Sequence, residues 1–485
     1  MSFIIFGAIT DFPARERRET ATKQTKLFAK IGIALLLIGF VSALPLTSAR
    51  VTVSMGDVEA MRIPSDLEAL NAYPPGQTFT DFVDGCVAFD QDMIDADQIA
   101  HPQGRWYGRG VVVAVLDTGM LPNWNYFFPK NRILTELAIG FAENLDTGEI
   151  TTVPWDDAVN GHGTHVTSTI IGYNYRGTPV TGVAPLTKII PVKVLSFYDY
   201  NRQSAWGTSG MVAAGIDYVT SLVESGMFER GKVIVNMSLG SSAPAPDIEA
   251  AINRAINAGV IVVASAGNRG NSGMGWPGAY PQVISAAWAG WTGQWFPIAG
   301  GMENRDFWFE DVPENLMMPA ATSTNFGSHS GTQVYVAAGS SRELAGQDLD
   351  VVAPGSWVVG PYWTPAWGSL PSDPSTCYGY LSGTSMASPH VAGTAALLAE
   401  KRGTKLTQSE MELLIESTAY SAPLTYANSG GWTGATLPFM AIYVNVGPTG
   451  YYWTQWDNNA AGEGFLQTDA AVAALGGQSR QTGES

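Results

Sequence analysis

The sequence is poor in cysteine and in charged residues. It has 2 Cys among 485 residues, and Asp, Glu, Lys and Arg together make up 14%. So few cysteines exclude a disulfide-rich scaffold, and because neither Cys86 nor Cys377 stands near a histidine at a ligand spacing, no zinc site is predicted. After export the two could form one disulfide; the alternative is two free, partly buried thiols. The 45% hydrophobic residues and 54 Gly indicate a compact, loop-rich globular protein and exclude a disordered or coiled-coil chain.

Positive charge is scarcer than negative charge. The chain has 26 Lys and Arg against 43 Asp and Glu, a formal net charge of −17. Such a surface repels phosphate backbones and anionic lipid, and no basic cluster compensates for it. We therefore expect no nucleic-acid partner.

A short apolar run lies near the N-terminus. Ile31 to Leu44 follows three lysines and precedes small residues around Ala49. This order predicts a signal peptide over residues 1–49, and the run is short for a membrane span, so cleavage is favoured over anchoring. The protein is then secreted or at the cell surface, and contacts a membrane only through this segment. An uncleaved signal anchor and a start codon other than Met1 stay open as alternatives.

The rest of the chain is predicted to form one large domain with additions. Residues 50–104 mix acids, prolines and turn residues without a period, which indicates an N-terminal extension or an abbreviated pro-region. The main domain spans 105–476, with insertions near 288–323, rich in Trp, and near 421–461, and 477–485 is a tail. Aromatic packing is the simpler interpretation of the Trp-rich insertion; a groove wall is the alternative.

Continuous apolar segments alternate with helical patterns in the main domain. Val111 to Leu116, Val233 to Val235 and Val260 to Val263 are apolar on both faces, which is typical of buried parallel strands. Helices are predicted over 211–225, 247–258, 387–401, from 407 to about 418, and over 462–475. This alternation predicts an α/β fold, a doubly wound and mostly parallel sheet with helices on both faces.

Four glycine-framed polar residues could carry chemistry. Asp117 ends the first predicted strand, and His162 lies in Asn160-Gly-His-Gly-Thr-His; Asn268 closes a later strand, and Ser385 precedes the 387–401 helix. Imidazole is suited to proton transfer near neutral pH, and a Ser at a helix N-terminus can present hydroxyl and amide to a carbonyl. Each residue alone has another explanation. Asp117 and Asn268 could be turn residues, and Ser385 could be a helix cap. His162 could be a buried structural histidine or form a metal pair with His165.

Together and in this order, the segments resemble the subtilisin-like serine proteases. The matching segments are Asp117-Thr-Gly, His162-Gly-Thr-His-Val, Asn236-Met-Ser-Leu-Gly, Ala266-Gly-Asn and Gly383-Thr-Ser-Met-Ala-Ser-Pro-His-Val-Ala-Gly, and the resemblance covers about 104 to 475.

The resemblance implies a serine endopeptidase acting on polypeptides through an acyl-enzyme. Ser385 would attack the carbonyl, His162 would move the proton, and Asp117 would orient the imidazole. The oxyanion would be bound by Asn268 and the Ser385 amide.

The resemblance also implies a substrate groove. It would be lined by Ser238, Leu239 and Gly240, whose backbone would pair with a peptide as an added strand, and by Ala266 and Gly267.

Some features depart from the family. The stretch before Trp106 is short for a folded pro-domain followed by a mature N-terminus. The loop 172–181, where relatives often bind calcium, lacks acids; no cofactor is required for chemistry, and structural calcium is a weak expectation. Arg269, after the oxyanion Asn, is predicted to disfavour Lys or Arg in the first specificity pocket.

Two other functions are alternatives to the peptidase. An aspartic protease needs two Asp-Thr-Gly motifs that share a proton, and no second one occurs. A catalytically silent subtilase fold acting as an adhesion or interaction protein is the more serious alternative, although all four key residues are present.

Overall fold

The computed structural model describes most of the predicted main domain. The described residues are 50–56, 58–63, 79–100, 104–291, 296–298, 301–303, 334–403, 405–420, 439–445 and 451–476. The predicted signal segment, much of both predicted insertions and the tail 477–485 lie outside them. Among the described helices, none combines the length and apolarity needed to span a bilayer.

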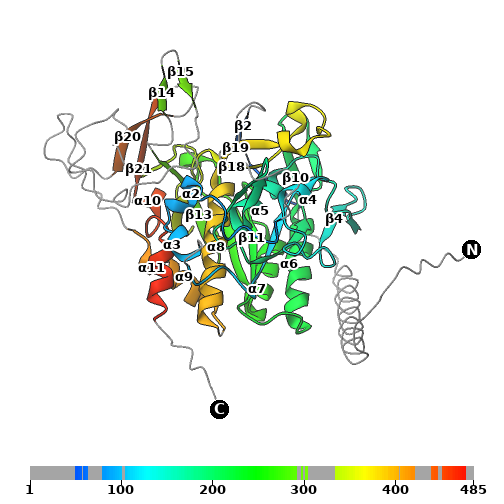
Figure 1. The fold of residues 1–485 in the computed structure, drawn as a ribbon. Coiled ribbons are helices and arrows are strands. Elements are labelled where there is room, and N and C mark those ends of the chain that lie inside the picture. The colour runs from blue at the N-terminus through cyan, green and yellow to red at the C-terminus, as the bar shows by residue number, and fades with distance from the viewer. Residues whose placement is uncertain are drawn as a thin grey trace, which may run out of the picture.

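A nine-stranded sheet forms the centre of the protein (Figure 1). Across the sheet the strands are β16 (Val334–Val336), β13 (Ile284–Trp291), β12 (Ile261–Ser265), β11 (Val233–Met237), β3 (Val112–Asp117), β8 (Lys188–Lys193), β4 (Ile139–Glu143) and β5 (Ile150–Val153), and β17 (Val351–Pro354) also pairs with β13. Only the β13–β16 and β4–β5 pairs within this sheet are antiparallel. The predicted doubly wound, mostly parallel sheet is confirmed.

Both faces of the sheet are covered by helices, which explains why its strands are apolar throughout. In β3 and the residue before it, Val111, Val113 and Val115 enter one hydrophobic cluster, and the residues between them enter the other. Helices α5 (His162–Ile171) and α8 (Thr384–Arg402) belong to the first cluster, and α6 (Ser209–Glu224) and α7 (Pro246–Ala258) to the second. Alternate residues of this wholly buried strand therefore belong to two different hydrophobic clusters, one on each face of the sheet.

Local sequence signals mark most helix ends where they were predicted. Gly259 ends α7 in the left-handed conformation with φ +87°, and Thr407 with Glu410 forms the capping box of α9 (Gln408–Thr418). The predicted helix over 462–475 is wrong in its first half. Gly462 and Gly464 have φ +54° and +137°, which a right-handed helix does not allow, so α11 runs only from Thr468 to Ala474.

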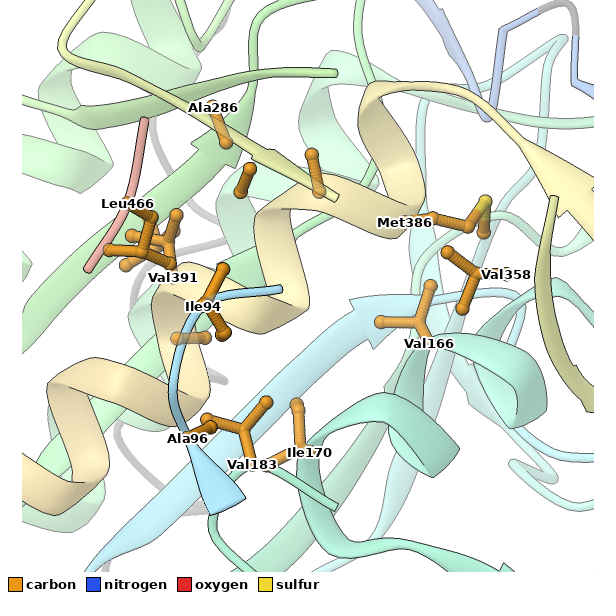
Figure 2. Close-up of a cluster of buried hydrophobic side chains, with 14 of the residues drawn as sticks. Ile94, Ala96, Val166, Ile170, Val183, Ala286, Val358, Met386, Val391 and Leu466 are labelled. Atoms are coloured by element: carbon orange, nitrogen blue, oxygen red, sulfur yellow. The ribbon is translucent and has the colours of Figure 1, made fainter. Parts of the chain in front are cut away.

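The second half of the N-terminal extension packs into the domain. It contains α2 (Phe89–Asp92) and α3 (Asp97–Ala100). Figure 2 shows Ile94 and Ala96 beside side chains of α5 and α8. Asp90 Oδ2 lies 2.9 Å from His390 Nε2 on α8, and both residues are buried. This segment is therefore an integral part of the hydrophobic core.

The first half of the extension contributes two strands. β1 (Thr52–Ser54) pairs antiparallel with β10 (Ser204–Thr208), which pairs with β9 (Phe197–Asp199). β2 (Glu59–Arg62) pairs antiparallel with β19 (Tyr378–Ser382), which also pairs with β18 (Val358–Pro361).

The remaining elements are short. They are α4 (Trp124–Phe127), α10 (Asn458–Ala461), and the hairpins β6 (Tyr173–Tyr175) with β7 (Thr178–Val180), β14 (Phe296–Ile298) with β15 (Gly301–Glu303), and β20 (Phe439–Asn445) with β21 (Tyr451–Asp457). Trp288 and Trp291, at the start of the predicted Trp-rich insertion, are buried residues of β13, as the packing interpretation expects. Cys86 and Cys377 are free thiols, so the possible disulfide is not formed.

Candidate active site

Asp117 lies at the carboxyl end of the central strand. β3 has β8 on one side and β11 on the other, so its end is a switch point of the sheet, where α/β proteins form their sites. The Asp117 side chain is fully buried, and its Oδ1 accepts a hydrogen bond of 2.7 Å from the Thr118 amide. The carboxylate is held in place by its own strand end.

His162 begins α5 and contacts this carboxylate. Its Nδ1 lies 2.8 Å from Asp117 Oδ1 and 2.9 Å from Oδ2, and its backbone N–H donates to Asn160 Oδ1. A carboxylate acceptor places a proton on Nδ1, so neutral imidazole leaves Nε2 as a base. Nε2 is buried and has no hydrogen-bond partner. The next residue must be glycine, because a Cβ there would lie 2.5 Å from the carbonyl oxygen of Gly119.

The other two histidines of the motifs hydrogen-bond elsewhere. His165 Nε2 lies 3.0 Å from the Val358 carbonyl oxygen, and burial lowers the pKa of His165 to about 3, so this ring stays neutral. His390 bonds to Asp90 and to the Met386 carbonyl. Because His162 faces Asp117 and His165 faces a backbone carbonyl, the geometry does not support a His162–His165 metal pair.

Ser385 lies in the first turn of α8, after the sharp bend at Gly383. Gly383 has φ +154°, and a Cβ there would lie 2.9 Å from Asn268 Nδ2. The Ser385 hydroxyl is within hydrogen-bond reach of the Ser238 carbonyl (3.2 Å) and the Met55 carbonyl (3.4 Å), rather than of His162 Nε2. Attack on a carbonyl therefore requires the hydroxyl to rotate about its Cα–Cβ bond.

Packing between α5 and α8 brings the His and Ser segments together. Figure 2 shows Val166 of α5 next to Met386 of α8 and Val358 of β18. Val166 lies one turn after His162, and Met386 follows Ser385 directly. The three side chains are almost completely buried, so the two helix N-termini share one rigid apolar support.

Asn268 lies opposite the start of α8 with a defined amide orientation. Its Oδ1 accepts from the Thr384 backbone N–H (2.9 Å) and from Thr384 Oγ1 (2.8 Å). The amide nitrogen is therefore the atom on the side of Gly383 and Gly56. The Ser385 N–H is among the first four of α8, which have no acceptor within the helix, so both groups could donate to an oxyanion.

The predicted groove backbone pairs with a strand of the same chain. Gly240 and Ser54 exchange two hydrogen bonds, 2.9 Å from the Ser54 N–H and 2.8 Å from the Gly240 N–H. Ser238 Oγ donates to the Ser385 carbonyl, while Leu239 and Ala266 are buried. Gly267, beside Asn268, donates its N–H to Thr384 Oγ1.

The strand β1, which pairs with Gly240 of the groove, was not predicted from the sequence. Its signal was the alternation in Val51-Thr-Val-Ser-Met55, in which Val53 and Met55 are buried while Thr52 is exposed.

The loop 172–181, where structural calcium is a weak expectation, contains an arginine and no acidic residue. Residues 173–180 form the β6–β7 hairpin, and the Arg176 guanidinium lies over the Tyr175 ring at 5.0 Å, which puts a positive charge there.

Three carboxylates converge elsewhere. The Asp350, Glu412 and Glu416 oxygens lie within 4.8 Å of one another; Asp350 directly precedes β17, and the two glutamates are on α9. Burial raises the pKa of all three, that of Glu412 to about 7.

Comparisons with known proteins identify the family of this chain. Residues 108–441 match the model of the subtilase family. The chain is 32% identical to subtilisin Savinase of Lederbergia lenta over 62% of this chain and 80% of the relative, and 29% identical to thermitase of Thermoactinomyces vulgaris over 64% and 82%. Fervidolysin from Fervidobacterium pennivorans, described as a keratinolytic enzyme related to subtilisin, shares the fold with a TM-score of 0.50 and 20% identity over 89% of this chain and 52% of that one.

Proposed function

The chain belongs to the subtilase family and is a serine endopeptidase, and from this premise we propose that Asp117, His162 and Ser385 are its catalytic triad and that it acts outside the cell. The observation that carries the proposal is the fully buried Asp117–His162 contact, with both carboxylate oxygens within 2.9 Å of Nδ1, in the same site as a serine at a helix N-terminus. Subtilases need no cofactor for catalysis.

The proposed reaction is acyl transfer. Ser385 Oγ attacks the carbonyl carbon of a polypeptide, and His162 Nε2 takes the hydroxyl proton and gives it to the leaving amine. Asp117 fixes the tautomer with Nδ1 protonated and stabilises the imidazolium. Water then hydrolyses the acyl-enzyme by the same proton route in reverse.

Two donors are proposed to stabilise the oxyanion. They are the Asn268 side-chain amide and the Ser385 backbone N–H, which lies at the positive end of a 19-residue helix. Ser238, Leu239 and Gly240 on one wall and Ala266 and Gly267 on the other would bind the residues before the scissile bond, with backbone pairing at Gly240. Recognition through backbone tolerates many side chains, which favours broad endoproteolysis.

Structural calcium stays a prediction that the reaction does not need. Its candidate ligands in the described residues are Asp350, Glu412 and Glu416. Asp350 is almost fully buried, and its Oδ1 has no hydrogen-bond partner while Oδ2 accepts from Ser285. An oxygen in this state would be satisfied by a proton or by a hard cation.

The proposed triad is tested with a fluorophosphonate probe and a peptide substrate. We expect labelling and hydrolysis in the parent chain, loss of both in Ser385→Ala, and retention of both in Ser409→Ala, an exposed serine on α9. A folded parent without Ser385-dependent labelling would contradict the proposal and favour the silent scaffold. Export is tested by sequencing the N-terminus of protein recovered from the medium; recovery only from inside the cells would contradict it.

A further inference from the structure

One buried side chain holds the start of α5, the helix that begins with His162. Asn160 Oδ1 accepts a hydrogen bond of 2.9 Å from the His162 backbone N–H. This N–H is the first of the helix and has no acceptor within it, and Asn160 is only 1% exposed, so bulk water does not replace the contact. Asn160 therefore fixes the backbone of His162, while Asp117 fixes its ring.

Two hydroxyl groups fix Asn160 in turn. Because Asn160 Oδ1 accepts from His162, Nδ2 is the donor, and it lies 3.3 Å from Tyr362 Oη and 3.4 Å from Thr364 Oγ1. Both partners are buried, and burial raises the pKa of Tyr362 to about 12, so its hydroxyl keeps its proton near neutral pH. Each N–H of the Asn160 amide thus has an acceptor.

The segment that carries these hydroxyls lies directly against the start of α5. The Gly161 N–H donates to the Trp363 carbonyl oxygen at 2.7 Å, and a Cβ on Gly161 would lie 2.8 Å from the Trp363 nitrogen. Trp363 Nε1 donates to the Gly368 carbonyl, and the Trp363 ring packs edge-on against Trp367, with centroids 5.7 Å apart. Residues 160–161 therefore contact a segment that is itself packed in place.

The network continues from Thr364 to the β9–β10 hairpin. Tyr198 of β9 donates its one hydroxyl proton to Gln203 Oε1 at 2.8 Å. The Thr364 hydroxyl is therefore the donor in its 2.9 Å contact with Tyr198 Oη, which leaves the Thr364 lone pairs to accept from Asn160. The hydrogen bonds from the His162 N–H to Gln203 all run in one direction, so each one strengthens the next.

We propose that Asn160 is a positioning residue of the catalytic centre, which sets where His162 Nε2 points; this rests on the proposed triad. Nε2 has no hydrogen-bond partner, so its place follows from Asp117 at Nδ1 and Asn160 at the backbone. The Ser385 hydroxyl has to rotate before it can give its proton to Nε2, and the transfer succeeds only if the base is already in place. A misplacement of about 1 Å can cost about 10²-fold in rate.

The proposal is tested by comparing how fast and how completely the fluorophosphonate probe labels Ser385. Asn160→Ala should lower kcat and the labelling rate about 10²-fold and change KM less than about twofold, while labelling still goes to completion. Asn174→Ala is the matched control in the β6–β7 hairpin. Asn174 likewise accepts from a backbone N–H, that of Gly177 at 2.8 Å, and donates to a carbonyl, that of Tyr126 at 3.1 Å. This control should lower the free energy of unfolding and change both rates less than about twofold.

The labelling experiment separates positioning from a purely structural role. If Asn160 only stabilised the fold, Asn160→Ala would lower the labelled fraction, and the molecules that remain folded would react at the parent rate. That result, or a loss confined to KM, would overturn the positioning role and leave the proposed triad intact. A folded parent that is not labelled at Ser385 would instead overturn the triad and this role with it.

Two further variants keep the test informative if Asn160→Ala does not fold. Asn160→Asp keeps an acceptor for the His162 N–H at the positive end of α5, and the two hydroxyls can turn to donate to it, so its kcat should fall less than about tenfold. Tyr362→Phe combined with Thr364→Val removes both acceptors of the amide. This pair should lower kcat at least about fivefold in the parent and less than about twofold in Asn160→Ala, where there is no amide to hold. A parent-like kcat for the pair, or an equal loss in the two backgrounds, would overturn the role of the hydroxyls in positioning.

Discussion

Asn268 has two structural roles that substitutions can separate. Its Oδ1 accepts two hydrogen bonds from Thr384, which fix the start of α8, and its Nδ2 is the proposed oxyanion donor. Asn268→Asp keeps the acceptor and removes the donor. Asn268→Ala removes both and leaves the buried Thr384 N–H without a partner. The two variants should therefore share a catalytic defect and differ in stability.

The expected magnitudes follow from these contacts. Loss of one oxyanion donor costs about 10²–10³ in kcat, a value measured in a subtilisin, which is a relative of this chain. The KM should change little, because the donor acts on the transition state. An unsatisfied buried N–H costs about 1–3 kcal/mol in the free energy of unfolding, which Asn268→Ala should show and Asn268→Asp should largely avoid.

The assay is steady-state hydrolysis of a chromogenic peptide by the purified enzyme, together with denaturant unfolding of each variant. Thr384→Val is the matched control, because it removes the hydroxyl hydrogen bond to Asn268 but neither oxyanion donor. If Asn268→Asp keeps kcat within about threefold of the parent, below the loss expected for one donor, the amide does not contact the oxyanion. If the variant loses activity only through a raised KM, with kcat unchanged, Asn268 acts in substrate binding instead.

Three further perturbations test neighbouring parts of the structure. Asp117→Asn should lower kcat about 10⁴-fold, because an amide no longer holds the Nδ1-protonated tautomer of His162; a loss below tenfold in a stopped-time hydrolysis assay would contradict this. Burial raises the pKa of Glu412 from its usual 4.5 to about 7, so its contribution to stability is full below pH 4.5 and is lost as the pH rises toward 7. Glu412→Gln should flatten the dependence of Tm on pH between pH 4.5 and 7. Above pH 7, calcium should raise the Tm of the parent but not that of the variant. Parallel Tm profiles for parent and variant would show that the Asp350, Glu412 and Glu416 cluster does not cause the pH dependence. Arg269, whose guanidinium donates to the Met274 carbonyl at 2.8 Å, should disfavour basic residues at the first substrate position, and a peptide-library profile rich in Lys or Arg there would contradict it.

The sheet and its helices could be predicted because each carries a strong local signal. Strands such as β3 are apolar on both faces, and α7 and α9 end or begin at residues with one dominant conformational role, Gly259 and Thr407. The start of the last helix was wrong because the apolar pattern continues through Gly462 and Gly464, and periodicity does not report that their backbone has positive φ.

The site residues could be predicted from their glycine-framed motifs, but the contacts that they make in the folded protein could not. The motif around His162 does not reveal that its ring meets both oxygens of Asp117, 45 residues away, because that contact depends on how α5 sits at the end of β3. The groove strand was missed for a related reason. β1 has three residues, and its partners, β10 and Gly240, lie about 150 and 190 residues further along the chain. Pairing at such separations is set by tertiary structure rather than by local propensity.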